Sequence, residues 1–264
     1  MVEGLLNDEV RRTAVEAATK AGALLMEGLG RSHHVEYKGE VDLVTEMDRA
    51  AEDLIVEMLR SRFPDHGILT EERAEMPSQS GERWIVDPLD GTTNYAHGFP
   101  VFCVSIAFER NGDVCLGAVY CPTLDELFTA EKGRGALLNG SPIAVSTVDS
   151  LERALLATGF PYDLRTSREN NIDHFKHFAM RSQAIRRAGS AALDLCYTAC
   201  GRFDGFWEFK LHPWDTAAGV LVVREAGGTV TALDGSPFVM ENGEVVASNR
   251  RIHNEMLRVL ALPS

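Results

Sequence analysis

The stretch Trp84-Ile-Val-Asp87-Pro-Leu-Asp90-Gly-Thr-Thr-Asn94 decides both the fold and the chemistry expected of this chain. Its apolar run predicts a strand that delivers Asp87 at its end, Pro88 restricts the turn that follows, and Asp90 comes three residues after Asp87. The two carboxylates can therefore converge at a strand terminus, where active-site clefts often form.

Carboxylates that converge need a counter-ion. Two of them about 5 Å apart repel by roughly 3 kcal/mol at an effective dielectric constant near 20, which favours protonation or a bound cation. Oxygen ligands suit Mg²⁺ or Ca²⁺, and because the spacing lacks the DxDxDG pattern of a calcium loop, we favour Mg²⁺. Gly91 allows close approach of the backbone, so the amides of Gly91 and Thr92 can cradle a phosphate. The alternative is a simple turn with solvated aspartates.

Two more acidic segments point the same way. Glu71-Glu72 follow the short run 67–70, and Trp214-Asp215 open a predicted helix whose N-terminal amides favour nearby anions. Single acids at such places are usually caps, so Asp215 alone is a weak indicator.

The remaining chain alternates helical and strand-like patterns. A helix is predicted from residue 7 or 8 to 28 or 30, and Thr45 with Asp48 resembles a capping box that opens a second helix, ended by Phe63-Pro64. Short β-rich runs from residue 66, with a hairpin at Asn111-Gly112, predict an antiparallel sheet. After residue 150, strands at 155–160, 184–189 and 204–209 alternate with helices near 166–182, 190–201 and 215–226, which indicates a mixed sheet layered with helices. We expect an α+β subdomain over 1–150 and an α/β subdomain over 151–264 that share a cleft.

Composition excludes several classes of protein. Lys and Arg number 26 and Asp and Glu 39, so the formal charge is 26 − 39 = −13, which argues against direct nucleic-acid binding. The five cysteines are odd in number and form no CxxC pair, and we see neither a secretory leader nor an 18-residue apolar span. A cytoplasmic protein that does not enter a membrane is expected.

Several familiar catalytic motifs are missing, and one segment matches a catalytic motif in its spacing alone. The sequence has no GxxxxGK[ST], GxGxxG, GxSxG or HExxH motif. Cys196 and Arg202 match the CxxxxxR spacing of cysteine phosphatases, but that thiolate needs a helix N-terminus, whereas Ala192, Leu195, Cys196 and Ala199 recur with helical spacing. We interpret Cys196 as a packing residue.

Several other residues carry open alternatives. The histidines His174 and His177 could pair on a metal, although a solvated helix face is favoured, and His212 is expected to be structural. Arg186 and Arg187 could steer phosphate or sit at a subunit contact. Lys38 indicates either a mobile loop or a plain surface lysine.

At this point the sequence resembles the inositol monophosphatase family of magnesium-dependent, lithium-sensitive phosphatases, over nearly its whole length. Asp87 to Asn94 match the family's first motif and Trp214 to Gly219 its second. The segments 38–48, with Lys38, Asp42 and Asp48, and 70–72 resemble the K…DxVTxxD and xEE elements. Gly189-Ser190-Ala191 resembles the GTA-like stretch beside the substrate, and Glu208 the polyol-contacting glutamate.

The resemblance implies a role for each matching residue. The metal ligands would be Glu71, Asp87, the carbonyl of Leu89, Asp90 and Asp215, holding two or three Mg²⁺ ions. Thr92, hydrogen-bonded to Asp48, would orient and activate the attacking water together with Glu71. The substrate would contact Asp90, Gly91, Thr92, Gly189, Ser190, Ala191, Glu208 and Asp215.

The resemblance also implies a fold and a reaction. The fold would be a layered α-β-α-β-α sandwich, usually a homodimer, and the partner a small-molecule phosphate ester. The reaction would be hydrolysis of a small polyol monophosphate, foremost myo-inositol 1-phosphate, by a metal-activated water. Relatives act on fructose 1,6-bisphosphate, histidinol phosphate or phosphoadenosine phosphate, and Lys210 stands where some relatives have a small residue, so these substrates stay open. A regulatory interaction protein on the same scaffold, or a calcium-binding structural module, is the alternative of another class.

Overall fold

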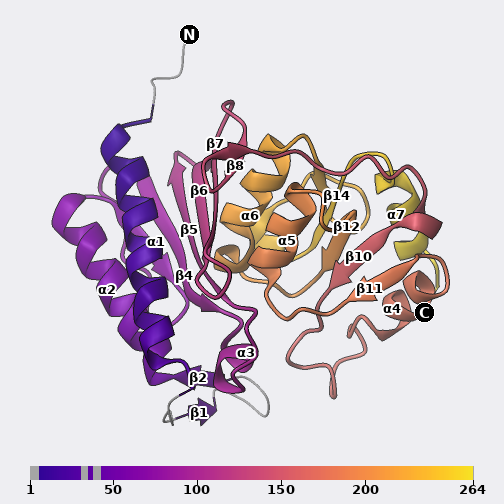
Figure 1. The fold of residues 1–264 in the computed structure, drawn as a ribbon, viewed down its shortest axis with the longest axis horizontal. Helices are drawn as coiled ribbons and strands as arrows, with labels where there is room; N and C mark the ends of the chain where they lie inside the picture. The colour runs from indigo at the N-terminus through magenta and orange to yellow at the C-terminus, as the bar shows by residue number, and fades with distance from the viewer. Residues whose placement is uncertain (1–5, 31–34, 38–42, 264) are drawn as a thin grey trace.

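The computed structural model of the chain describes residues 6–30, 35–37 and 43–263. It consists of five layers, helix, sheet, helix, sheet and helix, which run from left to right in Figure 1. This is the expected layered sandwich. Lys38 and Asp42 lie outside the described residues.

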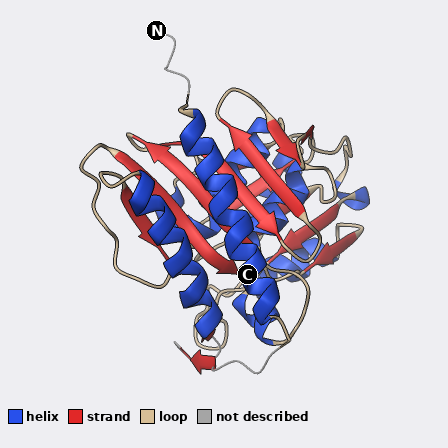
Figure 2. Cartoon of the chain, turned by 60° about the vertical axis from the view of Figure 1, so that its left-hand side comes forward, coloured by secondary structure: helices blue, strands red, loops and turns tan. Residues whose placement is uncertain are grey.

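The first layer holds the two long N-terminal helices, α1 (Asp8–Gly28) and α2 (Glu46–Arg62). Asn7 caps α1 by accepting a hydrogen bond from the amide of Glu9, and Thr45 and Asp48 form the predicted capping box of α2. The apolar faces of both helices pack on the first sheet, as Figure 2 shows from another side. A short pair of strands, β1 (Val35–Tyr37) and β2 (Leu43–Thr45), precedes α2.

The first sheet has the strand order β3-β4-β5-β6-β7-β8-β9. Its strands are β3 (Gly67–Thr70), β4 (Glu82–Asp90), β5 (Cys103–Arg110), β6 (Asp113–Cys121), β7 (Glu126–Glu131), β8 (Ala136–Leu138) and β9 (Ser141–Pro142). The sheet is antiparallel as predicted, including the hairpin at Asn111-Gly112, except that β3 pairs with β4 in parallel. The short helix α3 (Thr92–Ala96) follows β4 directly.

The middle layer is formed by α5 (Ala191–Ala199) and α6 (Pro213–Glu225), which pack on both sheets. The approach of α6 to the first sheet is close. A Cβ atom on Gly117 of β6 would lie 2.8 Å from the carbonyl oxygen of Ala218 in α6, so only glycine fits there.

The second sheet is mixed, with the order β11-β10-β12-β14-β13. It contains β10 (Leu155–Thr158), β11 (Ala184–Arg186), β12 (Gly205–Glu208), β13 (Thr229–Thr231) and β14 (Val245–Ser248). The outer layer consists of α4 (Ile172–Ala179) and α7 (His253–Leu260), and the single-turn helices η1 (Leu151–Arg153) and η2 (Met240–Asn242) lie in connecting segments.

One predicted helix is too long. The pattern near 166–182 forms a helix only from Ile172, because Asn171 adopts a left-handed conformation with φ of 70°. The buried Asn171 side chain donates to the carbonyl of Gly159 at 2.6 Å and accepts from the indole of Trp207 at 2.8 Å. These tertiary hydrogen bonds hold Asn171 outside the helix.

We predict that Gly117→Ala destabilises the protein by about 1 to 3 kcal/mol, because the added methyl group forces α6 away from β6. Urea denaturation followed by circular dichroism measures the change. Since α6 begins with the segment that carries Asp215, the phosphatase activity that the resemblance implies should fall as well. An unchanged midpoint would contradict the close packing of this helix.

Candidate active site

A cleft of about 300 Å³ opens where the two sheets meet. Its walls come from the end of β4, the start of α3, the loop after β10, the start of α5, the end of β12 and the start of α6. The residues predicted for metal and substrate line this one cleft; they are Glu71, Asp87, Leu89, Asp90, Gly91, Thr92, Gly189, Ser190, Ala191, Glu208 and Asp215. Asp48 lies behind Thr92.

Asp87 and Asp90 occupy a β-bulge rather than the predicted turn. Asp87 pairs with Ser105 and Asp90 with Cys103, so β4 carries one extra residue between these positions. Pro88 has no amide hydrogen for the ladder, and the amide of Leu89 donates instead to Asp87 Oδ1 at 3.0 Å. Because Asp87 is 2% and Asp90 9% exposed, the alternative of solvated aspartates is wrong.

Asp90 connects the two halves of the molecule. Its Oδ2 atom accepts hydrogen bonds from the hydroxyl of Ser190 at 2.7 Å and the amide of Ala192 at 2.8 Å. Ser190 is the N-cap of α5, so a carboxylate from the first sheet satisfies an otherwise unpaired amide at this helix start. These bonds fix one oxygen of Asp90 and thereby its orientation in the cleft.

Asp215 is fixed in a similar way at the start of α6. Its Oδ2 atom accepts a hydrogen bond of 2.6 Å from the amide of His212, while the ring of His212 stacks on Trp214 with a centroid distance of 4.7 Å. His212 therefore has the structural role predicted for it.

The buried carboxyl groups raise one another's pKa. Burial, followed by the negative charges of Glu71, Asp90 and Asp215, raises the pKa of Asp87 well above its usual range. Burial is also the main reason for the raised pKa values of Asp90 and Asp215. Groups whose ionised forms destabilise each other in this way form a site for positive charge.

Thr92 links this cleft to Asp48. Its hydroxyl lies 2.9 Å from Asp48 Oδ1 and 3.1 Å from the carbonyl oxygen of Leu89. Asp48 Oδ2 accepts from the amide and hydroxyl of Thr45, and burial raises the pKa of Asp48. The Thr92 hydroxyl is therefore held by an acceptor that the α2 capping box fixes in place.

Glu208 lines the same cleft, at the end of β12. It is 8% exposed, and burial together with the charge of Asp90 raises its pKa to about 8. Its carboxyl group packs directly on Gly159, where any Cβ atom would overlap it. The Asn171 side chain bonds to the carbonyl of Gly159 and to the indole of Trp207, and so links the two segments that meet at this contact.

The remaining candidates divide clearly. Arg187 lines the cleft, whereas Arg186 is exposed and donates to its neighbour's carbonyl. Lys210 Nζ binds Asp163 Oδ2 at 2.7 Å and Ser167 Oγ at 2.8 Å. Cys196 is fully buried inside α5, and burial raises the pKa of its thiol far above the usual range, as expected for a packing residue.

The two helix histidines lie on the partly exposed side of α4. His174 and His177 lie half-buried on α4, and their Nδ1 atoms are buried without a hydrogen-bond partner among the described residues. The ring of His174 packs edge-on against Phe209 at a centroid distance of 6.2 Å. This face is therefore neither fully solvated nor, within 6–30, 35–37 and 43–263, part of a metal cluster.

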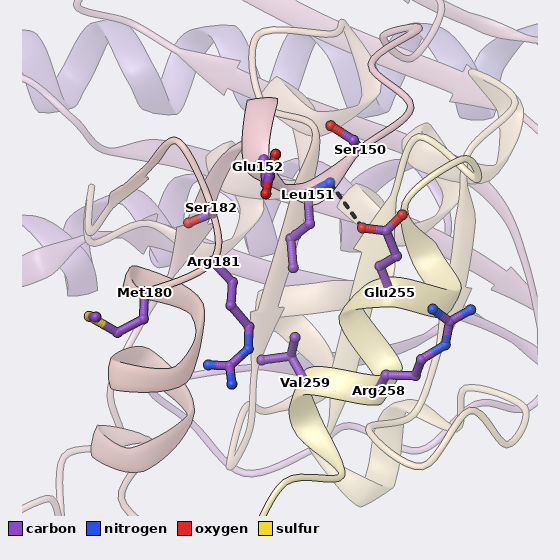
Figure 3. Close-up of a pocket in the computed structure, with 9 residues that line it drawn as sticks. All are labelled: Ser150, Leu151, Glu152, Met180, Arg181, Ser182, Glu255, Arg258 and Val259. Atoms are coloured by element: carbon purple, nitrogen blue, oxygen red, sulfur yellow. Dashed lines mark hydrogen bonds between the residues drawn. The ribbon is translucent and has the colours of Figure 1, made fainter.

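A second hollow of about 560 Å³ lies between η1, the turn after α4, and α7 (Figure 3). Here Glu255 accepts a hydrogen bond from the amide of Leu151 at 3.0 Å. The hollow shares no lining residue with the acidic cleft and mixes Glu152 and Glu255 with Arg181 and Arg258. It lacks the accumulation of buried acids that marks the cleft.

Comparison with known proteins decides the family. The model of the inositol monophosphatase family matches residues 6–261. The chain belongs to this family. It is 46% identical to the inositol-1-monophosphatase of Synechocystis over 94% of this chain and 87% of the relative, and 45% identical to the Nus factor SuhB of Pseudomonas aeruginosa over 94% of each. A crystal structure of suhB from Bartonella henselae superposes with a TM-score of 0.92 at 41% identity, covering 97% of this chain and all of that one.

Membership of the inositol monophosphatase family makes the chain a phosphoric monoester hydrolase. The family is metal-dependent, in agreement with the chemistry of the carboxyl groups described above. No helix of the described residues is long and apolar enough to cross a membrane.

Among the cleft residues that sequence reasoning overlooked is one acid, Asp194 in the first turn of α5. The available signal was an acid in the otherwise apolar helix Ala191–Ala199. Burial and the charge of Glu208 raise its pKa well above the usual range.

The pKa of Glu208 predicts a dependence of stability on pH. Between the usual value of 4.5 and about 8, the folded protein retains a proton that the unfolded chain has lost, so the unfolding free energy falls as pH rises. We expect Glu208→Gln to make this fall smaller by on the order of 1 to 4 kcal/mol between pH 5 and pH 8. Urea denaturation of the metal-free proteins at both pH values measures the unfolding free energy. An equal change in unfolding free energy between pH 5 and pH 8 for the wild type and Glu208→Gln would contradict the prediction.

Proposed function

We propose that this chain hydrolyses a small polyol phosphate monoester, foremost myo-inositol 1-phosphate, by direct attack of an activated water, with two or three Mg²⁺ ions as cofactor. The observation that carries the proposal is a group of four acids in one cleft: Asp87 and Asp90 are buried, Glu71 and Asp215 are half-buried, and the charges of the other three raise the pKa of Asp87.

The donor set fits hard cations. Three aspartates and a glutamate, with the carbonyl of Leu89, offer only oxygen ligands, and protein hydrogen bonds orient Asp87, Asp90 and Asp215. In the described parts of the chain, no group of three or more acidic, histidine or cysteine side chains stands, as it is, in an arrangement that could hold a metal ion. Bound divalent ions would supply a lowered pKa for a coordinated water and neutralisation of charge on the phosphate.

The chain's own groups account for water activation. The Thr92 hydroxyl donates to Asp48, which leaves its oxygen lone pairs to accept a hydrogen bond from the attacking water. The carboxylate of Glu71, which lines the same cleft, would take the proton. Proton transfer to a positioned group of this kind contributes typically 10²- to 10⁴-fold to the rate. We assign Thr92, Asp48 and Glu71 to this role.

Substrate binding divides between the two halves of the molecule. The phosphate would lie against the amides of Gly91 and Thr92, beside the first sheet. The alcohol would be contacted by Asp90, Asp215 and Glu208, together with the segment Gly189, Ser190 and Ala191 at the start of α5.

No cysteine in the cleft region is suited to form a phosphoenzyme. Burial raises the thiol pKa of Cys103, which adjoins Asp90, and of Cys196, so both remain protonated at neutral pH. This supports direct attack by water.

We predict that Asp90→Asn lowers turnover of myo-inositol 1-phosphate by roughly 10²-fold or more while the fold is kept, since one charge of the acidic group is lost. Phosphate release is measured with Mg²⁺, with Ca²⁺ and with Mg²⁺ plus Li⁺, using the exposed change Asp113→Asn as the control. The proposal expects activity with Mg²⁺ that lithium inhibits, and undiminished turnover by Asp90→Asn would refute the site.

A second prediction concerns the activation of water. Thr92→Val removes the hydroxyl with little change in shape and should lower kcat by roughly 10²-fold with KM nearly unchanged. Thr92→Ser restores the hydroxyl and should recover most of kcat. Steady-state kinetics with both variants decide the point; if valine is as active as threonine, the hydroxyl has no role.

The ester panel also separates the alternatives. Fructose 1,6-bisphosphate, histidinol phosphate and phosphoadenosine phosphate present the same phosphate with different alcohol portions. The name of the Pseudomonas relative, a Nus factor, keeps a regulatory role open for this scaffold. The complete acidic set favours turnover, because a purely regulatory protein does not need four carboxyl groups gathered in one cleft.

We also propose that the protein forms a homodimer. Light scattering of the purified protein measures its mass in solution and tests this proposal.

A further inference from the structure

Asp194 is a buried acid that the proposed reaction leaves unused. It is 1% exposed, lies in the first turn of α5 and lines the cleft, and its Oδ1 atom has no hydrogen-bond partner among the described residues. The charged groups that act on it are Glu208, Asp90 and Arg187. It therefore stands at the end of the cleft assigned to the alcohol.

A buried carboxyl oxygen without a partner disfavours folding. Asp204 shows the usual arrangement for a buried aspartate in the same half of the chain. Its Oδ1 accepts from the hydroxyl of Ser146 and its Oδ2 from the amide of Leu155 at 2.7 Å. Asp194 Oδ1 has no comparable hydrogen-bond donor, although the residue lines a cleft. We therefore expect a ligand in the cleft to supply the donor.

The neighbouring acid Glu208 packs with its carboxyl group against the backbone of Gly159. The side chain of Asn171 donates to the carbonyl of Gly159 and accepts from the indole of Trp207, the residue before Glu208. Asp194 and Glu208 are thus two buried carboxyl groups that line the same cleft and act on each other electrostatically, carried by different elements, α5 and β12.

We propose that Asp194 is a specificity-determining residue which, paired with Glu208, binds hydroxyl groups of a neutral polyol. The inference rests on the proposed function. A protonated carboxyl group offers one donor and an acceptor, as does a hydroxyl group, so the pair can satisfy two hydroxyls of the alcohol. The raised pKa values of both acids agree with an uncharged pair at neutral pH. An alcohol without hydroxyls would leave Asp194 unpartnered.

The test compares two esters and two variants. With Mg²⁺, Asp194→Ala should raise KM for myo-inositol 1-phosphate about tenfold with a smaller change in kcat, while kcat/KM for p-nitrophenyl phosphate stays within about twofold of the wild-type value. Asp194→Asn keeps a donor and an acceptor and should restore most of the affinity for the polyol ester.

The melting temperatures of two variants distinguish a role of Asp194 in substrate binding from a role in stabilising the fold. Because Asp194 has an unsatisfied oxygen, Asp194→Ala should leave the melting temperature unchanged or raise it, whereas the control Asp204→Ala, which breaks two hydrogen bonds, should lower it. Equal losses on both esters, or no loss on either, would overturn the inference. If the wild-type protein neither hydrolyses nor, by calorimetry, binds myo-inositol 1-phosphate, the proposed function fails first and this inference fails with it.

Discussion

Mutual repulsion among buried carboxyl groups is the constraint to which the rest of the structure responds. Asp87, Asp90 and Asp215 lie together at the junction of two sheets, where burial raises the pKa of each. Such a group is unfavourable for folding, and three apolar clusters, one on each outer side and one between the sheets, offset that cost. One oxygen of each aspartate is held by a backbone amide, so the repulsion cannot be relieved by rotating the side chains outward.

Local patterns were sufficient to predict the frame around this site. The α2 capping box, the hairpin at Asn111-Gly112 and the strand leading to Asp87 depend on residues close in sequence, and each was found where expected. The bulge at Pro88 was mistaken for a turn, because its form depends on pairing with β5. The early start predicted for α4 failed for a similar reason, since Asn171 bonds to residues 12 and 36 positions away.

The sequence predicted which residues form the site better than it predicted how burial changes their pKa values. Motif spacing brought out the acids of β4 and α6, but the raised pKa of Glu208 depends on burial against Gly159, which is distant in sequence. Asp194 escaped notice because a single acid in a helix is usually solvated. Only the packing of α5 between the sheets makes it a buried cleft residue.

The division of the cleft between the two halves has a consequence for specificity. Groups assigned to phosphate and water, Asp48, Gly91 and Thr92, belong to the first sheet and its helices, whereas Glu208 and Asp194 belong to the second half. Asp90 spans the boundary through its bonds to Ser190 and Ala192. Substitutions on β12 or α5 can therefore change which alcohol is accepted without moving the groups assigned to water activation, Thr92, Asp48 and Glu71, as long as Asp90 retains these bonds. A family that shares one reaction across several alcohols is the outcome expected of such an arrangement.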